Sequence, residues 1–283
     1  MTYFCGIYGY GIREPMSING IDIIPKYFGS VEAQLYHRNE KIYHLTAFAK
    51  TESYDPNVFF DLEAILAFIE RLDVLVSDPI NLSAANNKEV FSHFPDTIQL
   101  HQRHNGGGRV IEESIISKNG REDFIKAALA KLGDIKFCEQ TQFRGAFFKC
   151  VEAFRSPKPF LDVSYYFLFS ALESFARGKY SEYDKPAAEP INRLLEEYAF
   201  NITIDNPADL KRAISTYCHI RNALFHNGKL EKEVNINGKS TNLRLVDFYH
   251  YLSNLVPLVM MKAVGFDDGH IDWDGWIGRS LTK

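Results

Sequence analysis

The spacing of apolar residues changes near residue 135, and this change limits the folds open to the chain of 283 residues. Before that point, short runs alternate between apolar and polar residues, which predicts β-strands. After it, apolar residues recur every three or four positions, which predicts amphipathic helices. We therefore expect an α+β domain over residues 1–134, followed by an all-α helical bundle over residues 135–283.

The N-terminal part has three runs with the character of strands, at residues 2–12, 21–24 and 41–50. Helical spacing predicts helices over residues 61–76 and 121–132. Residues 96–101 and 109–117 are expected to form a hairpin, joined by the glycine-rich residues 105–108. A phosphate-binding loop would need a Gly-Lys-Ser or Gly-Lys-Thr sequence after the glycines, and none follows, so we assign this turn no chemistry.

The C-terminal part has five main segments with helical periodicity, at residues 142–155, 160–177, 191–198, 208–226 and 243–264. Residues 230–242 lack this periodicity and are expected to form a loop or a small hairpin. The tail at residues 267–276 is acidic and aromatic, but its carboxylates do not follow the spacing of a calcium loop. We interpret it as a packed or partner-binding tail.

The charge balance limits how the chain can meet a nucleic acid. The formal net charge is −4 and the sequence pI is about 6.2. An extended basic surface that holds nucleic acid tightly without sequence preference is therefore not expected. The chain is 46% hydrophobic and 14% aromatic, which suffices for a buried core and excludes a disordered protein. Contact with RNA, if made, should be local.

The chain has four cysteines that show no spacing typical of metal ligands: Cys5, Cys138, Cys150 and Cys218. They are expected to be free thiols in a reducing compartment. The first residues lack a basic region followed by an apolar run, as a secretory signal requires. The longest apolar segment, residues 252–266, contains Pro257 and Lys262 and is too short to span a bilayer. We expect a soluble, cytoplasmic protein and assign it no metal or cofactor.

Residues 221–228 read Arg-Asn-Ala-Leu-Phe-His-Asn-Gly and place an arginine and a histidine at the end of a predicted helix. On a helical projection, Arg221 lies in the middle of the apolar stripe of this helix, which consists of Leu210, Ala213, Ile214, Tyr217, Leu224 and Phe225. A buried guanidinium is costly unless it is paired. Arg221 is therefore expected to face a carboxylate, a subunit interface or an anionic ligand.

Asn222 and His226 are four residues apart and share a flank of the predicted helix. An ideal helix would hold Arg221 and His226 roughly 140° apart, so the two converge only if the helix distorts at its end. Gly228 is expected to end the helix, because glycine accepts the left-handed conformation that closes helices.

An arginine followed by a histidine five to seven positions later is a weak signal by itself. Three other pairs satisfy it: Arg38 and His44, Arg212 and His219, and Arg244 and His250. The full Arg-Asn-x-x-x-His sequence at the end of a helix is more specific. The structural alternative is an arginine–carboxylate pair with a surface histidine and an Asn-Gly cap.

Arg221, Asn222 and His226 match the signature of the HEPN superfamily, an arginine, a polar residue, three variable residues and a histidine. In that family the motif follows an apolar helix with an acidic residue, and residues 160–176 have this character. Their Ala-Leu-Glu-Ser-Phe segment, which contains Glu173, is similar to the ApeA-like branch of abortive-infection proteins. The resemblance covers about the last half of the chain.

This resemblance implies a metal-independent endoribonuclease that acts as a homodimer, with the motif helices of two protomers lining one composite cleft. His226 would exchange protons with the 2′-hydroxyl or the leaving oxygen. Arg221 would stabilise the charge on the phosphorane oxygens. Asn222 would orient the phosphate or His226, and Glu173 would hold Arg221.

The resemblance further implies a toxin of prokaryotic antiviral defence, in which the N-terminal domain is a sensor or regulatory part that meets a trigger or partner. The alternative is a non-catalytic HEPN-like protein whose motif helix only dimerises or binds a partner or small ligand. The presence of Arg221, Asn222 and His226 together favours catalysis, because a purely structural bundle needs no arginine on its apolar stripe.

Overall fold

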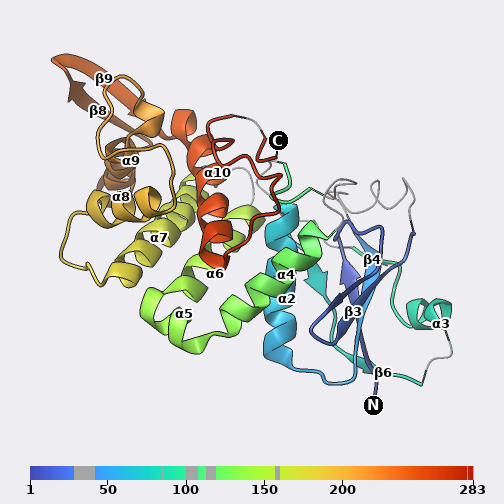
Figure 1. The fold of residues 1–283 in the computed structure, drawn as a ribbon. Helices are drawn as coiled ribbons and strands as arrows, with labels where there is room; N and C mark the ends of the chain where they lie inside the picture. Colours follow the sequence, from blue (N-terminus) through green and yellow to red (C-terminus); the bar gives the residue numbers. More distant parts are fainter. Residues whose placement is uncertain are drawn as a thin grey trace. The chain divides into compact units, whose positions relative to one another are not determined.

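The computed structural model describes residues 1–28, 42–83, 86–99, 108–112, 119–156, 160–278 and 280–282. The chain divides into two compact units, Met1–Gly133 and Asp134–Lys283. Figure 1 shows that strands are concentrated in the first unit, and that helices dominate the second. An antiparallel sheet region followed by a mostly helical part is thus present, as the sequence predicts.

The N-terminal unit is built on an antiparallel sheet with the strand order β2-β3-β4-β1-β5. Two further strands pair beside this path, β6 with β1 and β7 with β4. The strands that the structure describes in this unit are β1 (Tyr3–Tyr8), β2 (Met16–Ile18), β3 (Ile21–Pro25), β4 (Tyr43–Thr51), β5 (Leu75–Val76), β6 (Ile80–Asn81) and β7 (Thr97–Ile98).

Among the described residues of this unit, three helices accompany the sheet: α2 (Pro56–Glu70), α3 (Asn87–Ser92) and α4 (Gly120–Gly133). Phe4 of β1 and Phe48 of β4 form one core with Val90 of α3. The helices α2 and α4 pack through Phe68 and Phe124, whose stacked rings have centroids 5.3 Å apart. The central strands β1 and β4 are buried along most of their length.

The helix α2 lies earlier in the chain than the predicted residues 61–76. The side chain of Asp55 accepts a hydrogen bond from the amide of Asn57, and Pro56 occupies the first helical turn, so both favour a start at this point. The helix ends where Arg71 adopts the left-handed conformation, with φ 55°. Leu75 and Val76, which are predicted to be helical, instead form β5.

The hairpin predicted from residues 96–101 and 109–117 is contradicted only where the structure describes these residues. Thr97 and Ile98 pair with β4, a partner distant in sequence. Residues 109–112 form no strand, while residues 100–107 and 113–118 lie outside the described parts of the chain. Local alternation predicts a strand, but it does not identify the partner strand.

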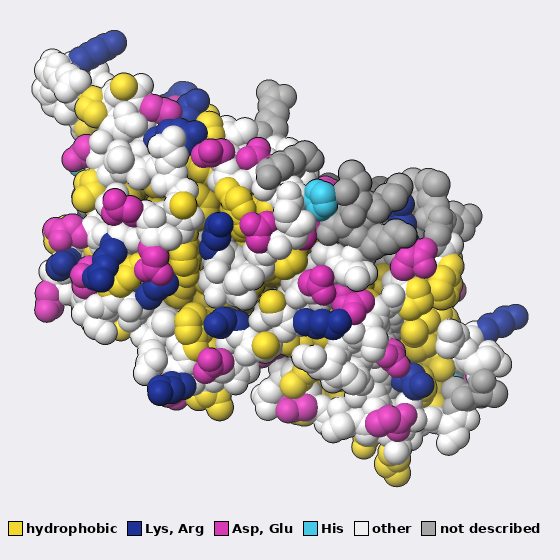
Figure 2. All heavy atoms as spheres, viewed as in Figure 1, with side chains coloured by type: hydrophobic (Ala, Val, Ile, Leu, Met, Phe, Trp, Pro, Cys, Tyr) yellow, Lys and Arg dark blue, Asp and Glu magenta, His cyan; other side chains and the backbone are white. Residues whose placement is uncertain are grey.

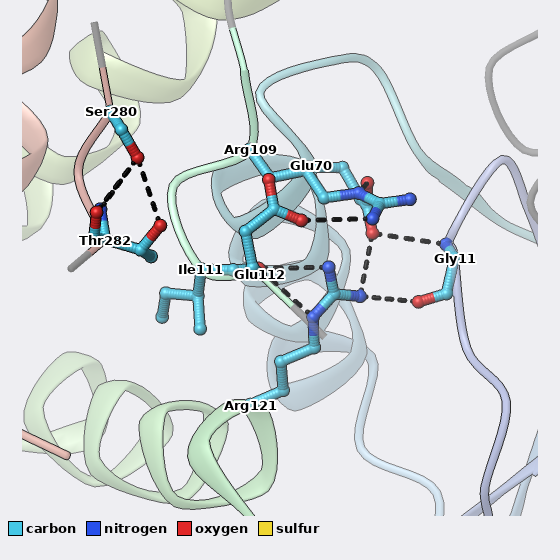
Figure 3. Close-up of polar contacts among 8 residues, drawn as sticks. All are labelled: Gly11, Glu70, Arg109, Ile111, Glu112, Arg121, Ser280 and Thr282. Carbon is cyan, nitrogen blue, oxygen red and sulfur yellow. Dashed lines mark hydrogen bonds and ion pairs between the residues drawn. The ribbon is translucent and has the colours of Figure 1, made fainter. Parts of the chain in front are cut away.

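A buried carboxylate joins four segments of the N-terminal unit (Figure 3). Glu70, at the end of α2, is fully buried and accepts hydrogen bonds at 2.8 Å from both Arg109 and Arg121. Its Oε1 also accepts the amide of Gly11 at 3.3 Å, and Arg121 donates to the carbonyl oxygen of Ile111 at 2.9 Å. The two guanidinium groups satisfy a charge that could not be buried alone.

The second unit, called the helical unit below, contains six α-helices and one 3₁₀ helix within its described residues: α5 (Ile135–Thr141), α6 (Phe143–Arg155), α7 (Leu161–Tyr180), α8 (Ala188–Glu197), η1 (Leu210–Arg212), α9 (Ile214–Asn227) and α10 (Leu245–Val264). The long helix α7 packs against α5, α6, α8, α9 and α10. Tyr165 of α7 donates a buried hydrogen bond at 2.8 Å to the carbonyl oxygen of Tyr217 in α9. Gly178 allows α7 to approach α5, since a Cβ there would lie 2.5 Å from the carbonyl oxygen of Thr141.

The motif helix α9 is shorter than the predicted residues 208–226. Ala213 adopts an extended conformation and pairs with Thr203 in an isolated parallel bridge, so the helix begins only at Ile214. After α9 comes a two-stranded hairpin of β8 (Glu231–Ile236) and β9 (Lys239–Arg244), which extends beyond the helices in Figure 1. Asn237 and Gly238, with φ of 52° and 82°, form its turn.

The helix α5 lies before residue 142, where the first helix predicted in this part of the chain begins. The C-terminal tail is packed, because Trp276 is fully buried. All four cysteines are free, and Cys218 is the only one of them that is not buried. Among the described residues, no helix is both long and apolar enough to cross a membrane.

Candidate functional site

Arg221 lies at the edge of the buried face of α9. The buried residues of the helix are Ile214, Thr216, Tyr217, Ile220 and Ala223. The predicted stripe had Arg221 in its middle, and this placement is wrong because Leu210 and Ala213 precede the helix. Phe225, another predicted member of the stripe, is 43% exposed. Arg221 therefore reaches both the neighbouring helix α7 and the surface.

Glu173 of α7 is the carboxylate partner of Arg221. Its Oε2 lies 2.6 Å from Nη2 of Arg221, and the two side chains are 15% and 26% exposed respectively. Its second oxygen, Oε1, accepts a hydrogen bond at 3.0 Å from Nε of Arg177, one turn later in α7. One carboxylate is thus shared by two guanidinium groups, which fixes its orientation.

The orientation of the Arg221 guanidinium is fixed by three further contacts. Its Nη1 donates to Oδ1 of Asn222 at 2.9 Å. Its central carbon lies 5.4 Å from the ring centroid of Phe169 and 5.6 Å from that of Phe225. Glu173 and Asn222 use two of the five N–H donors of an arginine, and the others make no hydrogen bond to the described residues. The guanidinium is held in place, is about one quarter exposed, and retains donors for an anion.

His226 is exposed in the last turn of α9 and makes no hydrogen bond or ion pair with the described residues. The helix stays regular to Asn227, and Gly228 closes it in the left-handed conformation with φ 61°, as predicted. Without a distortion, His226 and Arg221 remain roughly 140° apart around the helix. One chain therefore brings together Glu173, Arg221 and Asn222, but not His226.

A third cation, which the sequence does not predict, lies near Glu173, after Arg221 and Arg177. Lys149 of α6 donates hydrogen bonds from Nζ to the hydroxyls of Ser170 at 2.9 Å and Ser174 at 3.3 Å. Burial lowers the pKa of its ammonium group, and the charge of Glu173 acts in the opposite direction. The polar residues of α7 recur at a helical spacing within an apolar segment, and this was the signal available in the sequence.

Exposed apolar side chains surround the motif end of α9. They lie at or near the start of α7, at the end of α9 and in the residues after α9, and each is between 38% and 62% exposed: Phe160, Val163, Tyr166, Phe225, Leu230 and Val246. We call this set the apolar surface. Tyr166 and Phe225 contact each other, with ring centroids 4.6 Å apart.

A groove of about 700 Å³ adjoins the apolar surface, between the start of α7 and the segment that links α9 to the hairpin and α10. Leu230 and Val246 belong to both features. Two acidic and two basic residues also line the groove: Asp162, Glu231, Lys229 and Arg244. The charges that line the groove are therefore balanced.

Away from this site, acidic and basic side chains are mixed on the surface (Figure 2). On the face drawn in Figure 2, basic side chains are interspersed with acidic ones, and the described residues form no continuous basic patch there. Within the described residues, no group of His, Cys, Asp and Glu side chains is arranged to hold a metal ion.

Comparisons of the chain with protein-family models, curated proteins and solved structures find no match.

Proposed function

We propose that the helical unit is a HEPN-type bundle and that the protein is a metal-independent endoribonuclease, active as a homodimer. One observation carries the proposal. The Arg221 guanidinium is held at the surface by Glu173 and Asn222 but keeps unused donors. A growth-arresting role in defence against viruses, triggered through the N-terminal unit, would follow from the HEPN resemblance.

Arg221 would bind the phosphate that is cleaved. A planar guanidinium can donate two parallel hydrogen bonds to phosphate oxygens, and these bonds strengthen as negative charge grows in the transition state. Glu173 would keep the guanidinium in place, and Asn222 would orient the same group or the phosphate. Because Glu173 also binds Arg177, it does not cancel the local positive charge.

His226 would transfer the protons. It would take the proton from the 2′-hydroxyl, whose oxygen then attacks the phosphorus while the bond to the 5′-oxygen breaks and that oxygen gains a proton. The products would be a 2′,3′-cyclic phosphate and a 5′-hydroxyl. Histidine suits this role because it can both accept and donate a proton near neutral pH.

A composite site would explain why Arg221 and His226 point apart within one chain. In a two-fold dimer, Arg221 of one protomer could face His226 of its partner. The apolar surface lies beside both residues and would be covered in such a dimer. Its exposure in a single chain, together with the balanced charges of the adjoining groove, supports this assembly.

The first test is RNA cleavage in the presence of EDTA by the wild type and by the Arg221→Ala and His226→Ala variants. We expect cleavage by the wild type and none by either variant. His219→Ala is the matched control, because His219 is an exposed histidine on the same helix and is outside the proposed site. Cleavage that requires metal, or that survives both substitutions, would contradict the proposal.

A mixture of the two inactive variants tests the composite site. If each site combines Arg221 of one protomer with His226 of the other, a heterodimer of Arg221→Ala and His226→Ala keeps one intact site. An equal mixture should then recover about a quarter of the wild-type activity after subunit exchange. A site within one protomer would recover none. If the wild type neither cleaves RNA nor arrests cell growth, the ion pair is structural and the non-catalytic alternative holds.

A further inference from the structure

Lys149 is held in an unusual environment for a lysine. Two of its three N–H donors contact the hydroxyls of Ser170 and Ser174, and no carboxylate lies within ion-pair distance among the described residues. Taking an ammonium group out of water is costly without an opposite charge, and two neutral hydroxyls compensate only in part. The lowered pKa of Lys149, caused by burial, agrees with this cost. An anion would complete the site.

The position of Lys149 connects it to the Arg221 site. Around α7, Ser170 and Ser174 lie roughly 60° and 100° to one side of Glu173, while Phe169 lies about 40° to the other side. Lys149 contacts the two serines, and Arg221 lies over the ring of Phe169. The two cations therefore approach the same face of α7 from opposite flanks of Glu173.

The local charge favours an anion along this face. Three cations surround the single carboxylate of Glu173. Arg177 and Arg221 form ion pairs with it, and Lys149 interacts with its charge without a direct ion pair. The four groups carry a net charge of about +2 when all are ionised. The whole chain carries −4, so this face is a basic site on an acidic protein.

We propose that Lys149 binds a second phosphate of the RNA, next to the phosphate bound by Arg221. This inference rests on the proposed function and specifies its substrate as a single-stranded RNA with at least two successive phosphates across α7. A dinucleotide, which has one internucleotide phosphate, would not engage Lys149. The serines fix the ammonium group, and its third N–H donor reaches the phosphate.

The stability of a variant that lacks the charge of Lys149 distinguishes a binding role of this residue from a structural one. Replacing a poorly paired, partly buried charge by an apolar side chain of similar length is neutral or stabilising. The Lys149→Met variant should therefore keep or raise the melting temperature while it weakens RNA binding. A lysine retained for stability would show the opposite pattern.

The experiment measures binding of a single-stranded RNA oligonucleotide to the full chain carrying His226→Ala, at several salt concentrations. Adding Lys149→Met should lower the slope of log affinity against log salt by about 0.7, the value for one phosphate contact on a single strand. Lys136→Met is the matched control, because it removes an exposed lysine on α5 and should leave the slope unchanged. In the active protein, Lys149→Met should raise KM for the oligonucleotide by more than it raises KM for a dinucleotide, which lacks the second phosphate.

Each outcome decides one question. An unchanged slope in Lys149→Met, with RNA binding that still requires Arg221, would overturn the second phosphate site and leave the proposed function intact. Absence of RNA binding at low salt would instead overturn the proposed function. If Lys149→Met fails to fold, Lys149→Gln replaces it, since an amide can still donate to the serines without carrying the charge, and the same loss of slope is expected.

Discussion

The carboxylate of Glu173 lies 2.6 Å from the guanidinium of Arg221, although the two residues are 48 positions apart in the sequence. This contact joins α7 to α9 at the site where the motif reaches the surface. Because Glu173 also binds Arg177, the contact positions Arg221 without neutralising the cluster. The same residue therefore affects both stability and the proposed chemistry.

Replacing Glu173 by Gln should affect both properties. The amide cannot accept charge-assisted hydrogen bonds from Arg177 and Arg221 together, so we expect a loss of about 1–3 kcal/mol in the free energy of unfolding. RNA cleavage should fall further than this loss explains, because Arg221 would no longer be oriented. Urea denaturation and cleavage rates at equal folded fraction measure the two effects. Full activity in a destabilised Glu173→Gln variant would show that Glu173 does not position Arg221.

The buried carboxylate of Glu70 should be the most sensitive charged position of the N-terminal unit. Glu70→Ala leaves Arg109 and Arg121 without their buried partner, and breaking such a pair costs about 3–5 kcal/mol. Glu112→Ala removes a second carboxylate from Arg109, but its side chain is 46% exposed, so we expect a cost of about 0–1 kcal/mol. Denaturant unfolding followed by a probe in this unit compares the two. Similar values for both variants would contradict the interpretation of the Glu70 network.

We expect Glu197 to contribute to the acid sensitivity of the helical unit. It accepts hydrogen bonds from Lys179 at 2.6 Å and from Tyr180 at 2.5 Å, and these contacts lower its pKa from 4.5. Because its pKa is lower in the folded state, the carboxylate stabilises the fold above pH 4.5, and this contribution is lost as pH falls through the folded pKa.

The Glu197→Gln variant tests this prediction. Unfolding free energies measured from pH 7 down to pH 3 should differ between the wild type and the variant at neutral pH. The difference should shrink as the pH falls below the unfolded pKa of Glu197. A difference that is constant over the whole range would mean that the charge of Glu197 is not responsible.

The sequence predicted the parts of the structure that depend on local chemistry. The arginine on the predicted apolar stripe was expected to face a carboxylate, a subunit interface or an anionic ligand, and Glu173 provides the carboxylate. Glycine in the left-handed conformation ends α9 at Gly228, as expected. Two other contacts join segments that meet only through tertiary packing: β7 pairs with β4, and Lys149 contacts α7. Local periodicity in the sequence does not specify which segments meet in this way. His226 and Arg221 point in different directions because α9 stays regular to its end.

The apolar surface should mediate the proposed homodimer. A charge placed within a buried apolar contact loses its hydration without gaining a partner, so Tyr166→Asp and Val246→Asp should each weaken self-association. Tyr166 and Val246 are 40% and 62% exposed in one chain, so neither substitution should unfold it. Ile135→Asp is the control, because Ile135 is 71% exposed on α5, outside the apolar surface. Light scattering coupled to gel filtration should find a dimer for the wild type and for Ile135→Asp, and monomers for the other two variants. Cleavage of RNA should be lost together with the dimer, whereas a monomeric variant that cleaves at the wild-type rate would show that one chain suffices for catalysis.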